Sequence, residues 1–452
     1  MVHLGAGAFF RAHTAPFTED AAPGRDGWGI CAVAHSSHAL VDTLRRQDGL
    51  YSVLERGESG VRARVVGAVR EVLVGADEPR VLRERIADPE VGVVTVTVTE
   101  AGYRHDPATR RLRTDDPVLA AELADPDRPA DSLVGRLVDG LAVRAARGGP
   151  ELGVLVCDNV DDGGALLAGL VEEYCRRSSR SGLADWIADR VRFPSTVVDR
   201  IVPPPSSTDR AQAAELLGVA DDAAVATESH RLWVIGDDLP ADRPPWERAG
   251  ALVVPDVSPW ARAKLRLVNA PHTALALLGR LAGHRTVAEA MADDDLAAFV
   301  GDLLRDELVP TVAPAAGLVP ATVARTSLAR FGEPGLVHPL DQIATDTSLK
   351  MGPRLLAPVL EHRRAGRMPQ RAAVVLAAWV ASLRSRGRAP RDVHAVRLGR
   401  AAASAHPARA VLSLDDLVPA ELGADGPLVA LVEEIVPRLT SDGIDDVLRD
   451  LR

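Results

Sequence analysis

The chain has 452 residues, of which 46% are apolar, so it is long enough for two or more domains with substantial cores. Its 53 Lys and Arg against 63 Asp and Glu give a formal net charge of −10, which argues against nucleic acid as the main partner. Three cysteines without CxxC spacing argue against a disulfide framework and indicate a cytoplasmic protein. The sequence shows neither a signal-peptide pattern nor an apolar run long enough for a bilayer, so we expect no membrane partner.

A short predicted strand, Val2–Leu4, leads into a glycine turn. Glycines between a strand and a helix let backbone N–H groups approach a pyrophosphate at the helix N-terminus. Phe10 stands where the motif GxGxxG has its third glycine, so the pattern is equally typical of a simple turn. Because the strand begins at the second residue, the true start codon is left open. The residues predicted to contact a dinucleotide here are Gly5, Gly7, Ala8 and Phe9.

A second buried strand is predicted at Trp28–Ala34. At the carboxyl end of this strand, a dinucleotide-binding fold usually carries an acid for the ribose 2′-hydroxyl. The segment His35–His38 has neither an acid nor an arginine. The choice between NAD and NADP is therefore not decided by these residues.

Two further buried strands are predicted at Val91–Glu100 and Gly153–Asn159. Ligands of a doubly wound parallel sheet bind outside the carboxyl ends of its strands, so we expect Thr99 and Asn159 near the cofactor. A purely structural role for Thr99, and an Asx turn or helix cap for Asn159, are the alternatives.

The composition changes at Pro240–Pro245, a segment rich in proline and charge. Upstream of it, strand-like and helix-like runs alternate, whereas helix-like periodicity dominates downstream. We predict an α/β Rossmann-type domain at residues 1–245 and a mainly α-helical domain at residues 246–452, with the active site in the cleft between them.

The segment Lys264–Leu278 places Lys264, Asn269 and His272 in otherwise apolar surroundings. At about 100° per residue of an α-helix, the three side chains would share one broad face. A lysine that is poorly solvated has a lowered pKa, as a general base for an alcohol proton requires. The alternative is a lysine that reaches solvent, an asparagine that caps a helix and a histidine of the core.

The pattern K-x4-N-x2-H resembles the polyol-specific long-chain dehydrogenase/reductase family, which includes mannitol 2-dehydrogenase and fructuronate reductase. The glycine turn, the segments Thr97–Tyr103 and Phe193–Pro203, and the segment His338–Arg354 extend the resemblance over nearly the whole chain. It implies NAD as the cofactor and a reaction without a metal. The resemblance further implies catalytic roles for Lys264 as the general base, Asn269 and Asn159 at the reacting oxygen and His272 at the substrate, and substrate contacts from Asp199, Lys350 and Arg354.

The chain departs from the family pattern in its catalytic segment. The family sequence N-G-S-H reads N-A-P-H here, and Ala261 replaces a glutamate that mannitol enzymes often carry. Pro271 predicts either a kinked helix or a new helix whose first residue is capped by Asn269. Structural alternatives are a surface ion pair of Asp199 with Arg200, and a solvated helix face for Lys350 and Arg354.

The expected reaction is a reversible hydride transfer between NAD and a secondary alcohol of a linear polyol or aldonate. The product would be the matching ketose or keto-hexuronate, of the fructose/mannitol or the fructuronate/mannonate type, and the enzyme a monomer or homodimer. One alternative is a family member that binds the dinucleotide without catalysis. The other is a dehydrogenase of a phosphorylated sugar alcohol such as mannitol 1-phosphate.

Overall fold

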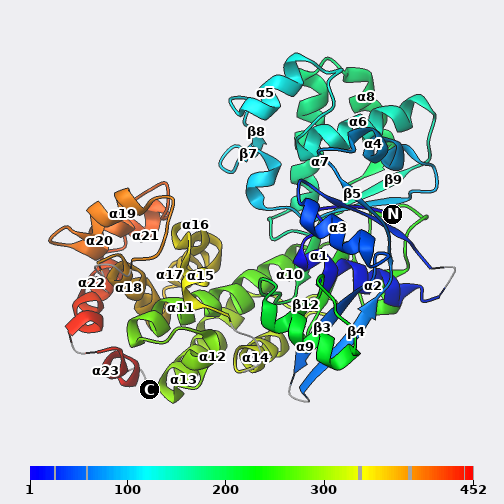
Figure 1. Cartoon of the computed structure of the whole chain (residues 1–452). Helices are drawn as coiled ribbons and strands as arrows, with labels where there is room; N and C mark the ends of the chain where they lie inside the picture. Colours follow the sequence, from blue (N-terminus) through cyan, green and yellow to red (C-terminus); the bar gives the residue numbers. More distant parts are fainter. Residues whose placement is uncertain (25–26, 58–59, 334–337, 385–388, 442, 451–452) are drawn as a thin grey trace. The chain divides into compact units, whose positions relative to one another are not determined.

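The computed structural model describes residues 1–24, 27–57, 60–333, 338–384, 389–441 and 443–450. The chain forms two compact units, Met1–Ser258 and Pro259–Arg452 (Figure 1). None of the helices in these described ranges combines the length and the hydrophobicity that a membrane span requires.

The first unit is built on a six-stranded, wholly parallel sheet. The strands are short runs rich in Val, Ile and Leu, and β1, β2, β6 and β9 are buried along their whole length, as expected for a sheet covered on both faces. The order of the strands is that of a doubly wound dinucleotide-binding fold, with its switch point between β1 and β6. In spatial order the strands are β10 (Val191–Arg192), β9 (Leu152–Val156), β6 (Val93–Val96), β1 (Val2–Leu4), β2 (Ile30–Ala34) and β5 (Val69–Val74).

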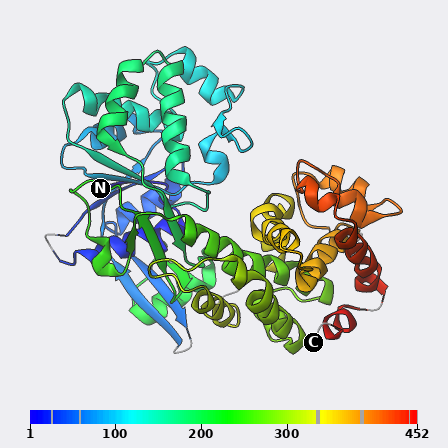
Figure 2. The same cartoon turned by 180° about the vertical axis from the view of Figure 1, so that it is seen from behind.

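Helices cover both faces of this sheet (Figure 2). On one face the core contains side chains of α4 (Pro79–Ala87), α6 (Leu133–Ala146), α7 (Gly163–Arg177) and α8 (Ser181–Arg190). On the other face it contains side chains of α1 (Ala8–Ala12), α2 (Thr14–Ala21) and α3 (His38–Arg46), together with Trp233 and Trp246. The remaining helices of the unit are η1 (Glu100–Tyr103), α5 (Pro117–Ala124), α9 (Ser207–Leu217) and η2 (Trp246–Ala249).

Three small sheets complete the first unit. They are β12–β3–β4 (Val225–Glu228, Tyr51–Gly57 and Gly60–Val66), β11–β13–β14 (Thr196–Asp199, Leu232–Gly236 and Leu252–Val254) and β7–β8 (His105–Asp106 and Arg111–Leu112). The three cysteines are free and buried.

The second unit is mainly helical, and the predicted fold class is thereby confirmed. Two of its helices, α11 (Ala270–Ala282) and α18 (Gln370–Arg384), are apolar on nearly all sides and pack against each other. The other helices are α10 (Ser258–Ala263), η3 (Lys264–Asn269), α12 (Val287–Met291), α13 (Asp294–Asp302), η4 (Leu303–Leu308), η5 (Val309–Thr311), α14 (Pro320–Phe331), α15 (Leu340–Ala344), α16 (Thr347–Met351), η6 (Gly352–Leu356), α17 (Ala357–Arg364), α19 (Ala395–Ala402), α20 (Pro407–Leu412), α21 (Ala420–Gly423), α22 (Gly426–Ser441) and α23 (Ile444–Arg449).

A buried histidine and a glycine join β1 to β6 at the switch point. The ring of His3 meets the hydroxyl oxygens of Thr95 and Thr97, at 2.7 Å from Nδ1 and 2.8 Å from Nε2. Gly5 has a φ of +111°, and a Cβ at this position would lie 1.7 Å from the carbonyl oxygen of Thr97. Only glycine permits this close approach of the two backbones.

Replacing Gly5 by alanine should destabilise the first unit, because the added methyl group has no room and its backbone conformation is strained. We expect the melting temperature to fall by about 10 °C or more. Gly169→Ala in α7 is the matched control, since nothing lies within 4 Å of the added methyl group and alanine favours a helix. A Gly5→Ala protein with the same melting temperature as the wild type would contradict this account.

Candidate functional site

The four residues predicted to contact a dinucleotide lie together at the turn between β1 and α1. Gly7 precedes the helix in an extended conformation, and a Cβ there would meet nothing closer than the Gly5 oxygen at 4.0 Å. Ala8 and Phe9 stand in the first turn of α1, where backbone N–H groups have no acceptor within the helix. The turn therefore offers donors and an open approach to an anionic group, so these residues fit the pyrophosphate of a dinucleotide.

Phe10, which replaces the third glycine of the motif, has a packing partner. Its ring stacks on that of His3 with the centroids 3.8 Å apart and 14° between the planes. Burial lowers the pKa of His3 to about 3, so the imidazole stays neutral. The aromatic side chain thus covers the histidine that holds the turn.

A half-buried carboxyl group links the ends of β6 and β9. Asp158 accepts a hydrogen bond from the Val98 N–H at 2.8 Å, and the hydroxyl of Tyr103 donates to its other oxygen. Removal from water raises the pKa of Asp158 to about 7. The predicted residues Thr99 and Asn159 are exposed and follow the same two strand ends, which places them at the edge where ligands of such sheets bind.

Asp199 ends β11 and is buried. Its carboxylate lies 3.7 Å from Nε2 of His230, a residue that we did not single out in the sequence. The alternative of a surface pair between Asp199 and Arg200 is wrong, because Arg200 is buried and forms its ion pair with Glu55 at 2.6 Å.

The predicted catalytic segment lies in one helical run from Ser258 to Ala282, interrupted by a single π turn. In this turn the N–H of Ala270 donates to the carbonyl of Leu265, five residues earlier. The expected α-helical spacing between Lys264 and His272 was therefore wrong. Pro271 has no N–H to donate, and in a regular α-helix its ring would clash with the carbonyl four residues earlier. The wider π turn accommodates both the missing hydrogen bond and the ring.

Asn269 does not cap a helix, so that alternative was also wrong. Its backbone is helical, with φ −78° and ψ −35°, and its side chain makes no capping bond. The Nδ2 atom of Asn269 is buried and has no hydrogen-bond partner among the described residues. Its amide thus remains available to a ligand.

Lys264 opens the π turn and is half-buried, whereas His272 is almost fully buried one turn into α11. The ring of His272 packs on that of Phe331 at 3.9 Å and meets the edge of His338 at 5.2 Å. His338 begins the segment that carries the two predicted substrate cations, so this segment and helix α11 meet at His272.

Arg354 and Lys350 do not lie on a solvated helix face. Arg354 is half-buried in η6 and donates from Nη1 to the hydroxyl of Thr273 at 3.0 Å, next to His272. Lys350 donates to the carbonyls of Ile343, at 3.1 Å, and Thr345. Burial lowers the pKa of Arg354 to about 10 and also lowers that of Lys350.

Arg266 anchors the π turn from its buried side. Its guanidinium forms two hydrogen bonds to the carboxylate of Glu361, at 2.8 and 2.6 Å, and a third to the Thr311 carbonyl at 2.7 Å. The paired bonds fix both position and orientation of the planar group. Sequence analysis missed this residue, although a buried arginine in an apolar helix needs such a partner.

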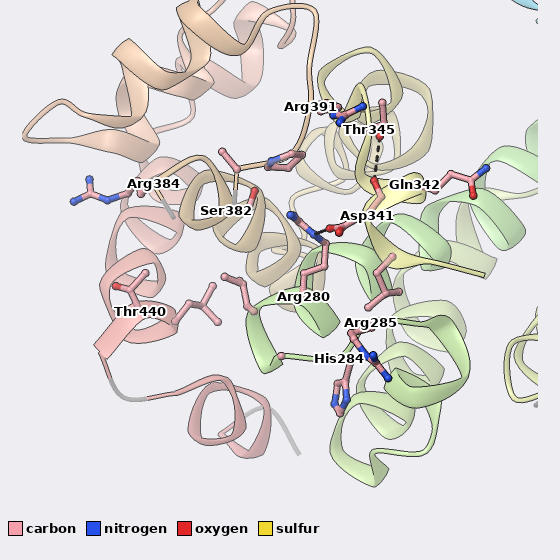
Figure 3. Close-up of a pocket in the computed structure, with 16 residues that line it drawn as sticks. Arg280, His284, Arg285, Asp341, Gln342, Thr345, Ser382, Arg384, Arg391 and Thr440 are labelled. Atoms are coloured by element: carbon pink, nitrogen blue, oxygen red, sulfur yellow. Dashed lines mark hydrogen bonds and ion pairs between the residues drawn. The ribbon is translucent and has the colours of Figure 1, made fainter. Parts of the chain in front are cut away.

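The second unit also contains a cavity of about 1100 Å³ at the carboxyl end of α11 (Figure 3). None of the predicted catalytic residues lines it. Arg280 forms an ion pair with Asp341 at 2.6 Å in its middle, while Arg384 points away from it (Figure 3). The arginines around this cavity therefore do not converge on one anion.

Comparison with known proteins assigns the family. A model of the mannitol dehydrogenase Rossmann domain matches residues 1–248, and one of the mannitol dehydrogenase C-terminal domain matches residues 256–431. The chain belongs to the mannitol dehydrogenase family. The resemblance seen in the sequence is thereby confirmed, and the chain is an oxidoreductase of CH–OH groups.

Relatives within this family cover most of the chain. The oxidoreductase YeiQ of Escherichia coli K12 is 38% identical over 80% of this chain and 74% of its own. The D-mannonate oxidoreductase of the same organism is 35% identical over 84% of this chain and 79% of its own. The structure of Pseudomonas fluorescens mannitol 2-dehydrogenase in ternary complex with NAD and D-mannitol matches with a TM-score of 0.86 and 29% identity, over 100% of this chain and 93% of that one.

The raised pKa of Asp158 predicts a pH-dependent stability. Between about pH 4 and 7 the folded state holds a proton that the unfolded state has lost, so stability falls as the pH rises through this range. Asp158→Asn removes the titrating group. The melting temperature of the variant minus that of the wild type should therefore increase by about 5 °C when the pH is raised from 5 to 8.

Asp161→Asn is the control, since Asp161 is exposed three residues away. The melting temperature of this variant should stay at a constant offset from the wild type over the same pH range. An equally constant offset for Asp158→Asn would show that Asp158 does not titrate near neutral pH.

Proposed function

We propose that the protein is a metal-independent NAD-dependent oxidoreductase with Lys264 as its general base. It interconverts a secondary alcohol of a linear polyol or aldonate and the matching ketose or keto-hexuronate. The family supports the reaction type, and the names of two relatives, D-mannonate oxidoreductase and mannitol 2-dehydrogenase with NAD and D-mannitol, support the substrate class.

The observation that carries the proposal is the buried Nδ2 of Asn269, for which the described part of the chain supplies no hydrogen-bond partner. A buried donor without a partner destabilises a protein by about 1–3 kcal/mol, which makes it an indicator of a missing ligand. The oxygen on the reacting carbon of the substrate is an acceptor of the required kind. Asn269 belongs to the same π turn as Lys264, which supports a shared role of the amide and the amine at one ligand atom.

The chemistry follows from these side chains. In oxidation, Lys264 as a neutral amine takes the hydroxyl proton, and in reduction the ammonium returns it. Asn269 stabilises the oxygen as negative charge develops on it. His272, fixed by Phe331 and His338, orients the substrate. Bound NAD would supply the hydride acceptor.

Arg354 favours a substrate that carries a carboxylate. In the described part of the chain no acid forms an ion pair with this half-buried guanidinium, which donates a hydrogen bond to the neutral hydroxyl of Thr273. Buried charges are normally paired, and arginine suits the two oxygens of a carboxylate. We therefore rank a hexuronate such as fructuronate above an uncharged ketose, with Lys350 contacting its hydroxyl groups.

Lys264→Ala should lower kcat by about 100- to 10,000-fold, the usual contribution of a general base, while NADH still binds. The measurements are steady-state NADH oxidation with the ketose substrate and NADH affinity by fluorescence. Arg262→Ala is the control, because Arg262 is exposed two residues earlier on the same helical run. If Lys264→Ala turned over the substrate nearly as fast as Arg262→Ala, Lys264 could not be the general base.

Arg354→Met should raise the KM for fructuronate by about 10- to 100-fold, because it removes charge-assisted hydrogen bonds to the carboxylate. The KM for fructose should change little. Arg325→Met, at an exposed position of α14, should leave both constants unchanged. An equal effect of Arg354→Met on both substrates would contradict carboxylate recognition.

A screen of NADH oxidation separates the proposal from its alternatives. Fructuronate, tagaturonate, fructose, xylulose and fructose 6-phosphate cover the three classes of substrate. Activity on fructose 6-phosphate alone would indicate a dehydrogenase of phosphorylated sugar alcohols. NADH binding without turnover of any of the five would favour a non-catalytic member of the family.

A further inference from the structure

The carboxyl end of β2 determines which dinucleotide a doubly wound fold accepts. An acid there binds the ribose hydroxyls of NAD, whereas an arginine nearby accommodates the 2′-phosphate of NADP. In this protein β2 ends at Ala34 and is followed by His35, Ser36 and Ser37, all of which are exposed. The place of the acid is therefore taken by residues that can donate hydrogen bonds.

An arginine reaches this place from a distant part of the sequence. Arg136 lies in the first turns of α6, and its Nη1 is 3.0 Å from Nδ1 of His35. The same guanidinium fills the space beside Gly75, directly after β5, where a Cβ would lie 2.7 Å from Nη1. Its Nε donates to the Ala130 carbonyl at 3.2 Å, and the side chain is only 7% exposed. The cation is thus fixed behind the ends of β2 and β5.

The contact with Arg136 determines how His35 can bind a ligand. Arginine has only donors, so Nδ1 of His35 accepts the hydrogen bond and its Nε2 carries the proton. Partial burial and the charge of Arg136 lower the pKa of His35, which keeps the ring neutral. An exposed N–H donor backed by a cation suits an acceptor-only group such as a phosphate.

Two carboxylates lie nearby, and each already faces a cation. Asp131 is 3.6 Å from Nη2 of Arg136, and Asp77 is 3.5 Å from Nδ1 of His38. Both side chains are about half exposed, at 49% and 55%. Neither directly follows β2, so neither stands where an acid would bind the ribose hydroxyls of NAD.

We propose that His35, oriented by Arg136, donates to the 2′-phosphate of NADP(H), and that the protein binds NADP(H) at least as tightly as NAD(H). The inference rests on the dinucleotide site of the proposed function and specifies its adenosine end.

Calorimetry of the full-length protein with two nicotinamide-free probes tests the inference without turnover. Adenosine 2′,5′-bisphosphate should bind about tenfold more tightly than 5′-AMP, because one charge-assisted contact is added. His35→Asp replaces the exposed donor by an acceptor, and the order of the two affinities should reverse. His406→Asp, the same substitution at an exposed position of the second unit, should leave the ratio unchanged.

Tighter binding of 5′-AMP than of the bisphosphate by the wild type would overturn the inference, as would an unchanged ratio in His35→Asp. Fluorescence titration with NADH and NADPH separates this failure from that of the proposed function. Tighter binding of NADH than of NADPH would overturn the inference and leave the proposed function standing. If neither dinucleotide bound, both would fail.

Discussion

A proline in the middle of an apolar helical run is the constraint on which the proposed catalytic segment depends. Pro271 cannot continue an α-helix without losing a hydrogen bond and meeting the carbonyl four residues earlier. The chain resolves the conflict with a π turn at Lys264–Asn269, and the bidentate pair of Arg266 with Glu361 holds that turn against the core. As a result the helical run continues, and the amide of Asn269 is spared from capping.

The first unit has a similar steric constraint where β1 ends. The backbones of Gly5 and Thr97 approach so closely that no side chain fits between them, and the neutral ring of His3 bonds to the threonines around this point. Phe10 shields that ring, which explains why the third glycine of the usual motif is dispensable here. The departures from the glycine motif at residue 10 and from the family pattern at residue 271 are thus both accommodated by local structure.

The fold class follows from local signals in the sequence. Runs of β-branched residues, a strand-to-helix glycine turn and a later change to helical periodicity were sufficient for it. The π turn was not predictable in this way, because a 3.6-residue pattern of apolar positions does not record one turn with an extra residue. The pairings of Asp158 with Tyr103, and of His35 with Arg136, join residues 55 and 101 positions apart, and composition at either end gives no sign of the other. The roles proposed for Lys264, Asn269 and His272 were inferred from the family pattern and await the experiments described above.

The free thiols have a practical consequence. Cys31 lies in β2 and Cys157 directly follows β9, so the two are embedded in the central sheet, and desolvation raises the pKa of both. Only a thiolate reacts readily with an alkylating reagent, and a buried thiol forms almost none at neutral pH. The rate at which these two positions are labelled would thus report how often the sheet opens. The native cysteines therefore serve as probes of local unfolding.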